Sequence, residues 1–271
     1  MAQPPFNQDP YGHNPYQAPD SNLYQQQNYD ISEKLTIEEA IASGYDFDIG
    51  TVVSDGWASL KGFQSKCIFA GLIAGAIFMA VGFVLALVFG SQSTTGEGIG
   101  NIITTGLQYI FGAGFAFMAL NHLRDEEVEV NQVFAGFSKA GPILLFLLVF
   151  FLIMLASMIP GGIVLFLLGL TGSKIGIVLG VIALMIPVIY LALSYQMTYW
   201  IIMDHPEASF WEAMEGSRKL ITQHWFKFLG LSIVLGIINL IGALLLLIGL
   251  FWTVPMSLLV TGHVYKAMFR A

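Results

Sequence analysis

Charged side chains are scarce in this sequence. Asp, Glu, Lys and Arg make up 11% of the 271 residues, whereas a soluble domain usually carries about 25%. Hydrophobic residues make up 56%. Because the chain has too few charges to cover a water-exposed surface, its composition argues against an ordinary soluble globular domain and indicates a protein that lies in lipid.

The scarcity is greatest in five stretches that hold no Asp, Glu, Lys, Arg or His. These stretches are residues 67–90, 102–120, 142–170, 175–203 and 228–262. A charge at the centre of a bilayer costs at least ~2.5 kcal/mol, so charges inside membrane segments usually mark ion or proton pathways. Their absence argues against a proton- or sodium-coupled pump and against a hydrolase with carboxylates at mid-depth.

Other absences narrow the class further. Cys67 is the single cysteine, which excludes an intrachain disulfide and a multi-cysteine metal site. No zinc-protease, phosphate-loop or nucleophile-turn motif is present, and no basic run suggests a nucleic-acid partner. We therefore assign no catalytic, metal-binding or cofactor-binding residue, and we expect no cofactor and no nucleic-acid partner.

Three regions follow from composition. Residues 1–32 are rich in Gln, Pro, Asn and Tyr and lack the basic start and apolar core of a signal peptide, so we expect a disordered cytoplasmic tail. Residues 33–66 are expected to form cytoplasmic and interfacial helices. Residues 67–271 are expected to form a six-span membrane domain.

The six expected spans come from apolar runs near the 20 or so residues that a helix needs to cross a bilayer. They are residues 67–90, 102–120, 142–170, 175–203, 226–247 and 249–264. Pro160 interrupts the third run, which is either one long kinked helix or a helix followed by a re-entrant piece. The sixth run is short and interrupted by Pro255. The sequence therefore predicts an all-α integral membrane protein with a six-helix transmembrane bundle.

The distribution of Lys and Arg gives an orientation. With the N-terminus in the cytoplasm, ten of the eleven Lys and Arg residues lie in inner segments, and only Lys174 lies in an outer loop. Cytoplasmic loops carry such an excess of positive charge. We therefore expect both termini in the cytoplasm.

Short amphipathic stretches precede the first, third and fifth spans. Thr36 and Glu39 predict a capping box at the start of the first such region. Gly56, Gly136 and Gly216 lie 80 residues apart at matching places in the three stretches. The spacing suggests three repeats of an interfacial helix plus a helical hairpin; coincidence among 29 glycines is the open alternative.

The candidate contact residues lie in these amphipathic stretches. The aromatic and basic side chains expected at the membrane interface or at a partner are Trp57, Trp211, Arg218, Lys219 and Trp225. Lys219 is also expected to pair with Glu215, one helical turn away.

Polar residues that end the second and fourth spans form a more speculative cluster: His122, Asp204, His205 and Glu207. Such residues could bind a divalent metal or a phosphorylated headgroup. The more ordinary interpretation is solvated loop charges, with Asp204 capping the following helix and Glu207 three residues on.

Inside the spans the remaining polar residues are neutral. They either line a path for a neutral or lipid-like solute or form hydrogen bonds between helices, and we favour the second interpretation. The pairs Gly71/Gly75 and Ser232/Gly236 are spaced to let helices approach closely.

The C-terminal third carries a family resemblance. The relevant segments are Asp204-His205-Pro206, Trp211-Glu212-Ala213, residues 217–220, residues 225–231, residues 249–255 and Tyr265. They resemble an uncharacterised bacterial integral-membrane family that looks related to the membrane domain of some glycerophosphodiester phosphodiesterases. The resemblance implies a six-span protein of the bacterial inner membrane. It lies in the membrane part alone and implies no phosphodiesterase activity.

These observations favour a non-enzymatic membrane protein that acts through contacts with lipids, other membrane proteins or a second copy of itself, as a scaffold or in envelope homeostasis. A passive or lipid-handling transporter is the first alternative, and an enzyme acting at the membrane interface is the second.

Overall fold

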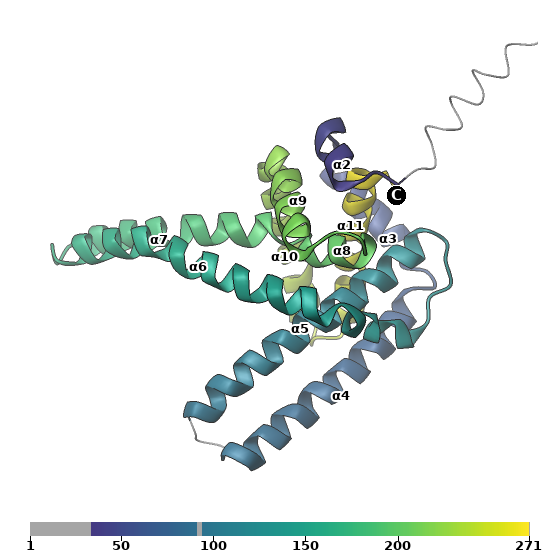
Figure 1. Ribbon diagram of the computed structural model, residues 1–271, viewed down its shortest axis with the longest axis horizontal. Helices are drawn as coiled ribbons and strands as arrows, with labels where there is room; N and C mark the ends of the chain where they lie inside the picture. The colour runs from purple at the N-terminus through teal and green to yellow at the C-terminus, as the bar shows by residue number, and fades with distance from the viewer. Residues whose placement is uncertain (1–33, 91–93, 271) are drawn as a thin grey trace, which may run out of the picture. The chain divides into compact units, whose positions relative to one another are not determined.

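The computed structural model describes residues 34–90 and 94–270, and every regular element in this part of the chain is helical (Figure 1). This confirms the all-α class. The disordered tail expected at residues 1–32 lies outside the described residues.

Five helical segments are long and apolar enough to cross a membrane. They are Gln64–Phe89, Thr94–Leu123, Val130–Gly169, Lys174–Asp204 and Trp225–Leu244. Each overlaps one of the first five expected spans, so the chain is a helical membrane protein. The sixth expected span corresponds to α11 (Leu250–Phe269), which is not among these five. Its second half is largely buried against protein, including Leu259, Val260 and Val264.

The third apolar run forms one continuous helix, α6 (Ala140–Gly169), with Pro160 inside it. It packs along α7 (Lys174–Ser194) through glycines: a Cβ added at Gly161 would lie 2.6 Å from the Cα of Leu184. A turn then separates α7 from α8 (Thr198–Asp204), so the fourth expected span consists of two helices.

Five short helices form what we call the base: α2 (Ile37–Ser43), α3 (Ile49–Ala58), the 3-10 helix η1 (Val130–Lys139), α8 and α9 (Phe210–Gln223). Two hairpins extend away from the base in different directions: α4–α5 (Gln64–Phe89 and Thr94–Leu123) and α6–α7 (Figure 1). The third hairpin consists of α10 (Trp225–Leu244) and α11.

Helix starts in the base follow from capping residues. The Thr36 hydroxyl accepts a hydrogen bond from the Glu39 backbone N–H at 3.3 Å, and the Glu39 carboxylate accepts one from the Thr36 backbone N–H at 2.9 Å. The capping box predicted for α2 is therefore confirmed. Asp48 caps α3 by accepting a 2.8 Å hydrogen bond from the Thr51 backbone N–H.

The apolar faces of the base helices are covered mainly by protein. Val52 of α3, Val133 of η1, and Met214 and Leu220 of α9 are all buried. A headgroup-plane position would leave these side chains in contact with lipid. The amphipathic pattern therefore marks packing within the base for most of the face, and only particular aromatic residues remain available for other contacts.

The predicted small-residue contacts are wrong for the glycines involved. A Cβ added at Gly71, Gly75 or Gly236 would meet no atom within 4 Å, so none of them lies at a close helix crossing. The close crossings occur elsewhere: a Cβ at Gly136 would lie 1.9 Å from the Ile110 carbonyl oxygen, and one at Gly114 would lie 1.9 Å from that of Val133. Spacing alone cannot tell which face of a helix meets a neighbour.

Candidate functional site

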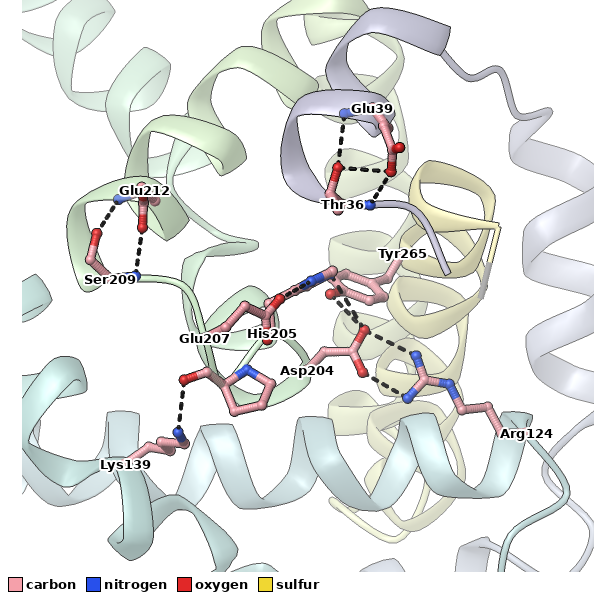
Figure 2. Close-up of polar contacts among 11 residues, drawn as sticks. Thr36, Glu39, Arg124, Lys139, Asp204, His205, Glu207, Ser209, Glu212 and Tyr265 are labelled. Atoms are coloured by element: carbon pink, nitrogen blue, oxygen red, sulfur yellow. Dashed lines mark hydrogen bonds and ion pairs between the residues drawn. The ribbon is translucent and has the colours of Figure 1, made fainter. Parts of the chain in front are cut away.

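The most connected polar group in the base joins three helices. The Arg124 guanidinium, just after α5, donates two hydrogen bonds to the Asp204 carboxylate of α8, at 2.7 and 3.0 Å (Figure 2). The Tyr265 hydroxyl of α11 donates a third, at 2.9 Å. We call Arg124, Asp204 and Tyr265 the base triad.

The base triad is buried and held in a fixed arrangement. The Asp204 and Arg124 side chains are 4% and 22% exposed, and Tyr265 is fully buried. The hydrogen bond to Asp204 raises the pKa of Arg124 above its already high usual value. A two-pronged pair of this kind holds a fixed geometry, so the triad links the ends of α5, α8 and α11.

His205 and Glu207 lie beside the triad. The His205 ring is 4.8 Å from the Phe269 ring, and its Nδ1 is 3.2 Å from a Glu207 carboxylate oxygen. Lys139 donates a 3.4 Å hydrogen bond to the Pro206 carbonyl, which attaches the end of η1 to the same loop (Figure 2).

The expected cap of α9 is wrong. Asp204 is the last residue of α8 and is engaged by Arg124, so it does not cap the next helix. Ser209 caps α9 instead, and its partner in the capping box is Glu212. The sequence offers two capping patterns, Ser209 with Glu212 and Asp204 with Glu207. Because Arg124 engages Asp204, the Ser209 pattern is the one that forms.

His122 belongs to a different contact. It donates a 2.8 Å hydrogen bond to the Ser59 carbonyl and lies 5.2 Å from the Phe63 ring. The Ser59 hydroxyl in turn lies 3.0 Å from Nε2 of His263. Among residues 34–90 and 94–270, no group of three or more His, Cys, Asp or Glu side chains could hold a metal ion.

Four of the five candidate contact residues are either exposed or paired with Glu215. Trp57 and Trp211 are 56% and 55% exposed. Arg218 donates two hydrogen bonds to Glu215, at 2.9 and 2.6 Å, and Lys219 lies 3.6 Å from the same carboxylate. The predicted Glu215–Lys219 pair is thus present, although Arg218 is the closer partner.

Trp225 is held within the protein. Its ring lies 6.1 Å from that of Tyr190 in α7, and it is only partly exposed. The neighbouring Phe226 is 82% exposed and faces outward in its place.

The surroundings of the two exposed tryptophans differ. Trp211 lines a groove of about 410 Å³ between α2 and α9 that also contains Glu38, Glu212 and Glu215. Trp57 lies at the end of α3, four residues before Lys61, which is exposed in the turn that follows. The carboxylates around Trp211 would repel an anionic lipid surface, whereas the positive charge of Lys61 would attract one.

Several of the neutral polar side chains in the spans bond to their own helix. Ser157, Ser194 and Thr261 donate to carbonyls three or four residues earlier, at 2.8, 2.7 and 2.9 Å. Asn239 of α10 also donates to the Ser257 hydroxyl of α11 at 2.8 Å. These bonds satisfy the three hydroxyl donors locally, whereas the buried Thr253 hydroxyl has no hydrogen-bond partner in the described part of the chain.

A cavity of about 570 Å³ lies between α4, α5, α8 and α11. Its walls are mainly apolar, and none of its lining residues is charged. Gly71 and Gly112 form part of the wall, and a Cβ added at either would meet no atom within 4 Å.

Sequence reasoning missed Arg124 and Tyr265 as partners of Asp204. One signal was present: Arg124 and Asp204 are 80 residues apart, the same interval that separates Gly56, Gly136 and Gly216. Comparison of the chain with protein-family models, with curated proteins and with solved structures finds no match.

Proposed function

We propose that this chain is a six-span protein of the bacterial inner membrane, with both termini in the cytoplasm, that acts without catalysis through lipid and protein contacts. The role is that of a scaffold or of a factor in envelope homeostasis. One observation carries the proposal: apolar hairpins with outward-facing Leu, Ile and Phe side chains extend from a base that holds the buried ion pair. Exposed apolar surface on this scale is stable only in lipid or against a partner.

The exposed residues of the hairpins support the lipid contact. Leu148 and Leu152 of α6 and Phe83 of α4 are 56%, 55% and 66% exposed. Side chains of this kind favour insertion by roughly 0.3–0.6 kcal/mol each near the bilayer centre. The base, by contrast, carries the capping boxes and ion pairs.

The contacts of three glycines support a three-unit arrangement. A Cβ at Gly56 would lie 2.4 Å from Val260 of α11, and one at Gly136 would lie 1.9 Å from Ile110 of α5. One at Gly216 would lie 2.6 Å from Ile37 of α2 and 3.7 Å from Ile201 of α8. Three base helices, α3, η1 and α9, thus each contact the last helix of another unit (α11, α5 and α8), as three units closed in a ring would do, and α9 also contacts α2 more closely.

The two exposed tryptophans suggest different partners. We assign Trp57, four residues before Lys61 in the chain, to anionic headgroups, and Trp211, in its acidic groove, to a basic polypeptide segment. In this proposal Arg218 and Lys219 act indirectly, because their ion pairs with Glu215 hold that carboxylate in place in the groove.

The experiment uses the full chain extracted with its native lipids in polymer-bounded discs. Wild type, Trp57→Ala and Trp211→Ala are compared for lipids and for co-purifying proteins, with Phe226→Ala as an aromatic control on another helix. We expect Trp57→Ala to lower the content of anionic lipid and Trp211→Ala to remove a protein partner. If the triple variant Trp57→Ala, Trp211→Ala, Arg218→Ala keeps wild-type lipids, partners and membrane placement, the contact role is wrong.

Topology is tested by reporter fusions. A reporter after residue 101 and one within residues 126–139 should lie on opposite sides of the membrane. If both report the same compartment, the layout of spans fails, and the proposed orientation fails with it.

The cavity between α4, α5, α8 and α11 favours a second candidate, a lipid-handling transporter. Lipid flux in proteoliposomes decides between the two. Protein-dependent scrambling of labelled phospholipid would replace the scaffold proposal, and no flux would remove the transporter.

A further inference from the structure

The cavity bounded by α4, α5, α8 and α11 is an apolar groove that opens on the protein surface. Its volume of about 570 Å³ falls within the roughly 300–1,000 Å³ typical of small-molecule pockets. Tyr199 and Trp200 of α8 line it on the side of the base, and Leu258 and Thr261 line it from α11. It therefore lies between two hairpins and reaches the base.

The residues that line the cavity favour a hydrocarbon ligand. No lining residue is charged, so nothing there would pair with a phosphate or an ammonium group. The Thr261 and Ser257 hydroxyls donate to carbonyls of their own helix, at 2.9 and 2.7 Å. The Trp200 indole N–H has no hydrogen-bond partner among the residues that the structure describes. Apart from that group and the Tyr199 hydroxyl, the lining offers a ligand mainly carbon atoms and dispersion contacts.

Glycines open the walls on two helices. Gly71 of α4 and Gly112 of α5 each face space in which a Cβ would meet no atom within 4 Å. A leucine at either position would fill part of this volume. Two of the helices that form the walls, α4 and α5, are themselves candidate membrane spans. In the proposed embedding, lipid tails therefore surround the cavity.

We propose that this cavity binds an acyl chain of a membrane phospholipid, which enters between the α4–α5 and α10–α11 hairpins. An apolar space of this size left empty would forfeit its dispersion contacts, and a lipid tail supplies them. The inference rests on the proposed embedding of the hairpins in a bilayer and names one lipid site within it.

The bound chain would contact the base directly. The Trp200 ring stacks on that of Tyr265, with centroids 5.9 Å apart, and the Tyr265 hydroxyl donates to Asp204. A chain bound in the cavity would thus pack against the Trp200 ring, which in turn packs against Tyr265 of the base triad.

The test uses Trp200 as its probe. The other four tryptophans are replaced by Phe (Trp57, Trp211, Trp225 and Trp252), and the protein is reconstituted in vesicles of phosphatidylcholine brominated on its acyl chain, which quenches nearby indole fluorescence. Trp200 is fully buried and lines the cavity, so we expect quenching only when a brominated chain enters. Gly71→Leu and Gly112→Leu should each remove most of this quenching. Gly75→Leu, on the same helix but outside the cavity lining, should retain it.

A second probe separates the two proposals. In a variant in which Phe also replaces Trp200, Leu152→Trp reports from the exposed face of α6. Quenching there without quenching of Trp200 overturns the acyl-chain site and leaves membrane embedding intact. Equal quenching of Trp200 in the two cavity-filling variants and wild type also overturns the site, because the signal would then come from bulk lipid. No quenching at either position removes the embedding and the site together.

A stability measurement guards against variants that bind differently because they are poorly folded. In detergent, added phospholipid should raise the Tm of the wild type and of Gly75→Leu, because a ligand that binds the folded state stabilises it. Gly71→Leu and Gly112→Leu should start with a Tm at least equal to that of wild type and show a smaller rise. A full lipid-induced rise in both would contradict the site.

Discussion

Arg124 and Asp204 lie 80 positions apart in the chain and form a buried, two-pronged ion pair. The pair connects the ends of α5 and α8, which complete the first and second hairpins. Tyr265, on the last helix of the third hairpin, donates to the same carboxylate. A single carboxylate therefore holds together the three chain segments that return from the hairpins.

Removing Arg124 should destabilise the base strongly. In Arg124→Ala the Asp204 carboxylate, 4% exposed, loses its charged partner, and breaking a buried pair typically costs about 3–5 kcal/mol. Tyr265→Phe, which removes one hydrogen bond, should cost about 1 kcal/mol. Thermal unfolding in detergent measures both. The charge-swapped Arg124→Asp, Asp204→Arg variant is the control and should be more stable than Arg124→Ala alone; an unchanged Tm for Arg124→Ala would contradict the ion pair.

The sequence predicted the class of the protein because hydrophobic length and missing charge are local properties. The first five apolar runs became helices that could cross a membrane, and the Thr36–Glu39 capping box formed as expected. Both depend on residues close together in the chain. The family resemblance and the sidedness of the membrane stay predictions.

The partners of individual residues could not be predicted in the same way. Asp204 has a capping role available three residues before Glu207, and only the folded position of Arg124 shows that the carboxylate is engaged elsewhere. Gly71 and Gly136 look alike in sequence, yet one faces a cavity and the other faces the carbonyl of Ile110. Such differences arise from tertiary contacts between distant segments.

The three glycines spaced 80 residues apart should differ in their tolerance of alanine. Gly136→Ala should be the most destabilising, because its Cβ would lie 1.9 Å from a backbone carbonyl oxygen. Gly56→Ala should follow, with Val260 atoms at 2.4 Å and 3.0 Å, the second of them backbone. Gly216→Ala should be mildest, since its three nearest atoms all belong to side chains, the closest being the Cγ2 methyl of Ile37 at 2.6 Å.

Gly75→Ala is the matched control for this series. Its Cβ would meet no atom within 4 Å, and Ala is favoured over Gly inside a helix by roughly 0.5–1 kcal/mol. Its Tm should therefore equal or exceed that of wild type. Equal Tm values for Gly136→Ala and Gly75→Ala would mean that η1 does not cross α5 closely.

Acid should weaken the base. The pKa of Glu215 is lowered by its hydrogen bonds from Arg218, that of Asp46 by its hydrogen bond from Lys227, and that of Glu212 by the Ser209 backbone N–H. A carboxyl whose folded pKa lies below its unfolded value stabilises the fold fully at neutral pH. This contribution is lost as the pH falls below about 4, the region of the unfolded values, and through the folded pKa.

The measurement is Tm as a function of pH between neutral and about pH 3, below the usual carboxyl pKa values. Glu215→Gln should lower the Tm at neutral pH and flatten its decline in acid. Arg218→Gln should have the same effect, because it removes the partner that lowers the pKa of Glu215. A variant whose acid decline matches that of wild type would show that this pair contributes nothing to the pH dependence.

The turn between α10 and α11, which the six-span proposal places at the outer side of the membrane, should lie in the apolar layer just short of the outer aqueous phase. Leu244–Ile248 is entirely apolar, and Leu246 is 84% exposed on the protein surface. By contrast, the α6–α7 turn contains Thr171 and Ser173, whose polar side chains can be hydrated. Phe251 also lies near the start of α4, since its carbonyl accepts a 3.2 Å hydrogen bond from Gln64.

In a Cys67→Ser background, Leu246→Cys should react with a membrane-impermeant maleimide only after the membrane is dissolved, whereas Thr171→Cys should react from outside intact cells. Labelling of Leu246→Cys in intact cells would place this turn in the outer aqueous phase and contradict its burial in the apolar layer. Labelling only in inverted vesicles would place the turn on the cytoplasmic side and contradict the proposed six spans.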